Sequence, residues 1–147
     1  MRNGNFNNRQ NVPQAAPGTA ANNHFGTLPF QPSWITEGAN KELVVYAEDM
    51  GKWMADKKLT SSKIRNVYSE IKRIQMDYAN NRSSFYLLKP KVAYAVGRDQ
   101  QNEGLRLFQL VFNAAADCVT DERTYKNFCN LIEAVLAYHK AYVKNDK

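Results

Sequence analysis

The sequence predicts an all-α protein, a compact bundle of about five helices preceded by a disordered N-terminal tail. From Thr36 onward, apolar residues recur at helical spacing, with no sustained alternation of polar and apolar residues and no hairpin-type turn. A chain of 147 residues is long enough for one domain with its own core. The longest apolar runs have five residues, whereas a membrane helix needs about 20. We therefore expect no contact with a membrane.

Residues 1–35 are predicted to form the tail, and residues 36–147 the helical bundle. The tail contains four of the five prolines, seven asparagines and no acidic residue. Such a composition leaves too little apolar surface to offset the conformational entropy lost on ordering. Four apolar residues near its end could dock on the domain or on a partner, although we favour a partly ordered lead-in: Phe25, Leu28, Phe30 and Trp34.

The first two helices are expected over about residues 38–56 and from the N-cap candidate Thr60 to about residue 78. On the second, apolar residues follow Ile64 at i+3, i+4, i+7, i+10 and i+14, which is typical of an amphipathic helix. Asn80 is expected to open a loop. Pro90 fits the first turn of a third helix that ends near Gly97.

A fourth helix is predicted over about residues 103–118, and a fifth after the N-cap candidate Thr120. Asp121 and Glu122 follow directly and would lie at the positive end of the fifth helix dipole. Because short segments link the five amphipathic helices, we expect them to pack as a bundle.

Positive charge is concentrated in residues 57–98. The chain has a net charge of +6, and this segment alone has ten basic and two acidic side chains. The segments on either side, residues 36–56 and 99–147, are acidic or nearly neutral. Such a polarised charge distribution favours a polyanionic partner.

Helical projection at about 100° per residue places two basic stripes within this segment. On the second helix Arg65 and Lys72 share one flank, while Glu70 and Asp77 lie on the opposite flank beside Lys63. The two signs are therefore segregated, whereas a solvated helix more often interleaves them to form i, i+4 pairs.

The second stripe lies on the third helix, where Lys91, Tyr94 and Arg98 are spaced at i, i+3 and i+7. They lie opposite the apolar Val92 and Val96. An aromatic ring between two cations suits a nucleic acid whose bases or sugars are accessible. The alternative is that Tyr94 belongs to the core and that the cations form an ordinary solvated face.

The sequence contains no catalytic constellation, so we predict no enzyme, no cofactor and no metal site. His24 lies in the predicted tail, and His139 stands alone in the last helix. Cys118 and Cys129 lack the CxxC partners of a structural zinc site, and no glycine-rich phosphate-binding motif occurs. Two cysteines and no secretory signal indicate a reducing, cytoplasmic location.

Three runs resemble the small subunit of type III-A CRISPR effector complexes, the Csm complex. Residues 59–70 read LTSSKIRNVYSE, similar to the LTxSQIRxFYxE of that family. Residues 88–98 read LKPKVAYAVGR, similar to LKPKLAYxxGR, and residues 128–140 resemble the family's ending FxEAIVAYHK. The runs occur in the family's order, and the Asn-rich residues 1–35 lie outside the resemblance.

The resemblance implies a non-catalytic, RNA-binding scaffold subunit that acts in antiviral defence. Its copies would stack along the duplex of guide RNA and target RNA, beside the backbone and large subunits of the complex. The residues that would face RNA are Arg65, Lys89, Lys91, Tyr94 and Arg98, with Lys63 and Lys72 in addition. The alternative is a helical protein–protein adaptor whose basic face meets an acidic partner.

Overall fold

The structure is a computed structural model that describes residues 15–144. Within this range all regular elements are helices and no strand occurs, so the predicted all-α class is confirmed. In chain order the elements are α2 (Thr19–Phe25), α3 (Ser33–Thr36), α4 (Lys41–Asp56), α5 (Ser61–Gln75), the 3₁₀ helix η1 (Tyr78–Asn80), α6 (Arg82–Tyr86), α7 (Leu88–Gly97), α8 (Glu103–Ala116) and α9 (Glu122–Tyr142).

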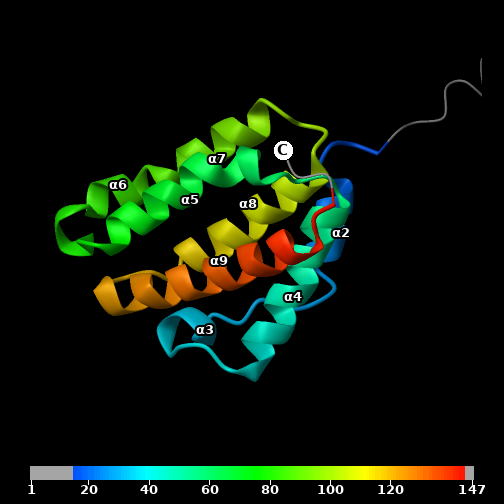
Figure 1. The fold of residues 1–147 in the computed structure, drawn as a ribbon. Helices are drawn as coiled ribbons and strands as arrows, with labels where there is room; N and C mark the ends of the chain where they lie inside the picture. Colours follow the sequence, from blue (N-terminus) through cyan, green and yellow to red (C-terminus); the bar gives the residue numbers. More distant parts are fainter. Residues whose placement is uncertain (1–14, 145–147) are drawn as a thin grey trace, which may run out of the picture.

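The longest helix, α9, lies at the centre of the bundle. On one side it crosses α4, and on the other it contacts α5 and α8 (Figure 1). Helices α5, α6 and α7 form a hairpin that lies over α8 and α9. Where this hairpin rests on α8 and α9, the rings of Phe85, Phe112 and Tyr125 surround Phe128 at centroid distances of 5.4–5.6 Å. The aromatic cluster joins three of the elements, α6, α8 and α9.

The five predicted helices are present, with differences at their ends. Thr60 occupies the N-cap position of α5, but its hydroxyl contacts Ser62 and makes no capping bond. The cap of α9 is Asp121 and not Thr120: its carboxylate accepts the Thr124 amide at 2.9 Å, and the Thr124 hydroxyl accepts the Asp121 amide at 3.0 Å. Where a loop was expected from Asn80, the chain forms η1 and α6.

The prediction of a disordered tail is wrong for residues 15–35, which pack on the bundle. The carboxylate of Glu103, in the first turn of α8, accepts the backbone amides of Gly18 and Ala21, each at 2.9 Å. It thereby satisfies amides at the start of α2 that have no partner within the helix. Ala21 is fully buried against the core. The remaining residues of the predicted tail, 1–14, lie outside the described part.

The second half of this segment is held by α3. Trp34 is 2% exposed, and its indole N–H donates to Asn40 at 2.9 Å. The carbonyl of Ile35 accepts a hydrogen bond of 2.8 Å from Asn127 on α9, and Phe30 meets Trp34 edge to face. The aromatic residues therefore dock on the domain, and the structured unit begins well before the predicted boundary at residue 36.

We expect Glu103→Ala to release α2 from the bundle. The amides of Gly18 and Ala21 would lose their acceptor, which should lower the free energy of unfolding by about 1–2 kcal/mol. Denaturant unfolding measures the loss, and hydrogen exchange of residues 18–25 locates it. Glu122→Ala is the matched control, because Glu122 also lies in the first turn of a helix and removing it costs only the dipole interaction. Equal losses of stability in the two variants would contradict the role of Glu103 in holding α2 on the bundle.

Candidate nucleic-acid interface

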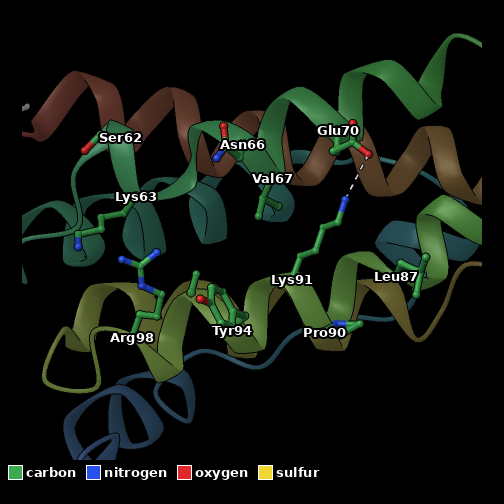
Figure 2. Close-up of a pocket in the computed structure, with 11 residues that line it drawn as sticks. Ser62, Lys63, Asn66, Val67, Glu70, Leu87, Pro90, Lys91, Tyr94 and Arg98 are labelled. Atoms are coloured by element: carbon green, nitrogen blue, oxygen red, sulfur yellow. Dashed lines mark ion pairs between the residues drawn. The ribbon is translucent and has the colours of Figure 1, made fainter.

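A groove of about 730 Å³ runs between α5 and α7 (Figure 2). It exists because Leu88, Val92 and Val96 are buried beneath α7, which leaves the other face of that helix towards α5 and solvent. The lining residues are Ser62, Lys63, Asn66, Val67 and Glu70 from α5, and Leu87, Pro90, Lys91, Tyr94, Ala95 and Arg98 from α7 and its two ends.

Tyr94 supplies the aromatic ring of the groove, and 67% of its surface is accessible. The Arg98 guanidinium lies over its ring, with the guanidinium carbon 5.8 Å from the ring centroid. Tyr94 is therefore not a core residue, and the predicted stripe on α7 lies on the surface. The arrangement presents an aromatic face and a cation side by side, one helical turn apart.

The two lysines of the groove lie close to carboxylates. Lys91 Nζ is 3.6 Å from Glu70, and Lys63 Nζ is 3.3 Å from Asp99. Glu70 also accepts two hydrogen bonds from Arg73, at 2.9 and 3.1 Å, and these lower its pKa below the usual value. Glu70 is therefore ionised at neutral pH and places a negative charge at the Lys91 end of the groove.

Arg98 lies at the other end of the groove. Among residues 15–144, no carboxylate lies within ion-pair distance of its guanidinium. In Figure 2 this guanidinium points from α7 towards Lys63 on the opposite wall. Of the charged residues that line the groove, Arg98 and Lys63 lie at one end, and Lys91 lies with its carboxylate partner Glu70 at the other.

Three predicted site residues lie elsewhere. Arg65 lines a smaller hollow of about 220 Å³ between α5 and α9, beside His139. Lys72, on the same flank of α5, donates to Glu133 of α9 at 2.7 Å. Lys89 forms an ion pair with Asp117 at the end of α8. The structure therefore brings Lys63, Lys91, Tyr94 and Arg98 together, and separates Arg65, Lys72 and Lys89 from them.

Sequence reasoning missed the apolar part of the groove. Val67 is buried as predicted, but it also contributes to the floor of the groove. Leu87, just before α7, is 57% exposed and lines the groove together with Pro90. Leu87 is an i−4 neighbour of Lys91, so extending the α7 stripe by one turn towards the N-terminus was the available signal.

Neither histidine lies in the groove. His139 is 1% exposed, and its Nε2–H donates to the Leu59 carbonyl at 2.5 Å. His24 stacks on Trp53 with ring centroids 4.7 Å apart, and its Nε2 lies 2.8 Å from Asp49. Within residues 15–144, no group of three or more His, Cys, Asp or Glu side chains is placed to hold a metal ion. No helix in that range has the length and apolarity needed to cross a membrane.

Fold and groove together define a small all-helical protein with a mixed basic and aromatic surface. The family model Csm2 Type III-A matches residues 37–145, and the chain therefore belongs to this family of small subunits of the type III-A CRISPR Csm complex. This confirms the resemblance found in the sequence. The match includes both walls of the groove and leaves α2 and α3 outside. Searches of curated proteins and of solved structures gave no significant match.

Proposed function

We propose that this protein is a non-catalytic, cytoplasmic scaffold subunit that binds RNA in the type III-A effector complex. Several copies would line the duplex of guide and target RNA in antiviral defence, in contact with the backbone and large subunits. The observation that carries the proposal is the pair of Tyr94 and Arg98, exposed in a groove that also contains Lys63 and Lys91. Family membership supports a place in the complex.

Contacts with the sugar–phosphate backbone of RNA account for this surface better than hydrogen bonds from the protein to the bases. Lysines supply point charges for phosphates, and base pairing with the guide already carries the sequence information. The ion pairs of Lys63 and Lys91 are exposed, and pairs of this kind contribute little stability. An RNA phosphate can therefore replace Asp99 or Glu70 as the partner of these lysines at little cost to the fold.

A charge-matched comparison tests the groove as the binding site. Arg98→Glu should weaken RNA binding about tenfold, because one phosphate contact is replaced by a repulsion. Arg65→Glu changes the net charge equally but lies towards α9, so it should weaken binding by less than about threefold. Fluorescence anisotropy with a short RNA at several salt concentrations measures both effects. For three neutralised phosphates, log K should fall against log[salt] with a slope of about −2 to −3.

Equal losses in the two variants would show that total charge, and not the groove, governs binding. A larger loss in Arg65→Glu would move the contact to the flank of Arg65 and Lys72 that the sequence also predicts. If neither RNA binding nor salt dependence is seen, the adaptor role is preferred.

One observation favours that adaptor role as the second candidate. Met76, at the end of α5, is 87% exposed, and Tyr86, at the end of α6, is 62% exposed. Exposed apolar and aromatic side chains of this kind are enriched at protein–protein contacts. Both lie towards the end of the α5–α6–α7 hairpin, so a protein contact there would leave the groove open.

A further inference from the structure

We propose that the groove between α5 and α7 holds one unpaired nucleotide of RNA, with its base on the ring of Tyr94 and its phosphate beside Arg98. This inference rests on the proposed function, and it specifies which form of RNA the groove prefers. Phosphate binding alone leaves the apolar part of the groove unexplained.

The groove combines an apolar floor with charged walls. Val67, Leu87, Pro90 and Ala95 line it together with the ring of Tyr94. A surface that only follows a phosphate backbone needs cations and gains nothing from exposed apolar side chains. A nucleobase, in contrast, offers a flat face that stacks on an aromatic ring and buries apolar surface.

Tyr94 is available for such stacking. Its side chain is largely exposed, and its ring lies near the Arg98 guanidinium on the same helix. The fold therefore gains little from this exposed ring. Bases within a duplex are already stacked on their neighbours and cannot lie on Tyr94, so the groove must select a base that has left the stack.

The charge distribution orients the nucleotide. Glu70 lines the groove at 3.6 Å from Lys91, whereas Asp99, the partner of Lys63, does not line it, and Arg98 has no carboxylate partner among residues 15–144. A phosphate is therefore favoured at the Arg98 end, where Lys63 lines the opposite wall. The volume of about 730 Å³ lies within the range of small-ligand sites, so a base and its sugar fit between the helices.

Two RNA hairpins test the inference with the full-length protein. They share one stem, and one of them carries a single unpaired 2-aminopurine in the middle of that stem. The bulged hairpin should bind about tenfold more tightly than the fully paired one. The fluorescence of 2-aminopurine should fall on binding, because the base stacks on Tyr94.

Three variants separate stacking from other effects. Tyr94→Leu keeps an apolar side chain but removes the ring, so the preference for the bulge should fall below about twofold. Tyr94→Phe should keep the preference. Tyr86→Leu is the matched control, since Tyr86 is also an exposed tyrosine but does not line the groove.

If both hairpins bind equally, or if Tyr94→Leu retains the preference, the unpaired-nucleotide site is wrong while RNA binding by the subunit stands. If neither hairpin binds at any salt concentration, both this inference and the proposed function fail.

Discussion

Gly51→Ala should lower the free energy of unfolding by about 2–3 kcal/mol, which is the cost of overpacking a well-filled interface. Gly51 lies where α4 crosses α9. A Cβ atom there would stand 2.5 Å from the Val135 carbonyl oxygen, 2.7 Å from the His139 amide nitrogen and 3.0 Å from the Tyr138 Cβ. Two of these atoms belong to the backbone of α9, so relief requires the two helices to move apart.

The better helix propensity of alanine, about 1 kcal/mol, does not offset this clash. The midpoint of thermal unfolding, followed by circular dichroism, should fall by about 5–12 °C. Gly97→Ala is the control, because Gly97 is also a helical glycine but has no neighbouring heavy atom within 4 Å of an added Cβ. That change should raise stability by about 0.4–1 kcal/mol. A loss in both variants, or in neither, would contradict the close approach of α4 and α9.

Phe128→Ala should have the largest effect on stability, about 3–5 kcal/mol. The Phe128 side chain is fully buried, and its ring lies 5.4 Å from Phe112 on α8 and 5.6 Å from Phe85 on α6. Removing it would leave a cavity where the α5–α6–α7 hairpin rests on α8 and α9. Because a domain is stable by only about 5–15 kcal/mol, much of the total would be lost.

Phe128→Leu keeps most of the buried volume and should cost only about 1–1.5 kcal/mol, so it gives a measurable value even if the alanine variant does not fold. Tyr86→Ala is the control on the surface, because the Tyr86 side chain is 62% exposed, and its loss should stay within about 0.5 kcal/mol. Urea unfolding of the four proteins gives the comparison. An alanine variant at position 128 as stable as the one at position 86 would contradict the aromatic cluster.

Helical periodicity was sufficient to predict the main helices. Of the apolar residues predicted on α5, Ile64, Val67, Ile71 and Ile74 are buried, whereas Tyr68 is half-buried. Pro90 lies in the first turn of α7, where its missing N–H costs no hydrogen bond. Such features depend on residues three or four positions apart. They are therefore visible in a single sequence, as are the three runs that identified the family.

The stripe of Lys91, Tyr94 and Arg98 was likewise predictable, because one helix carries all three residues. Projection also placed Arg65 and Glu70 correctly on opposite flanks of α5. It did not indicate which flank would face α7. Packing settles this: the Lys72 flank meets Glu133 on α9, and the Glu70 flank meets Lys91 on α7. Three of the six basic residues that were predicted to face RNA therefore lie outside the groove.

The order of residues 15–35 was decided by tertiary structure alone. Composition weighs the entropy of a segment against its own apolar residues, and by that measure these residues should not fold. The decisive partners are far away in the sequence: Glu103 lies 85 and 82 positions from the two amides it accepts. Asn127 lies 92 positions from Ile35, whose carbonyl it binds. Local pattern thus determined the helices and the exposed stripe of α7. Contacts between distant residues decided which faces meet and where the folded unit begins, because their free energy appears only once the bundle has formed.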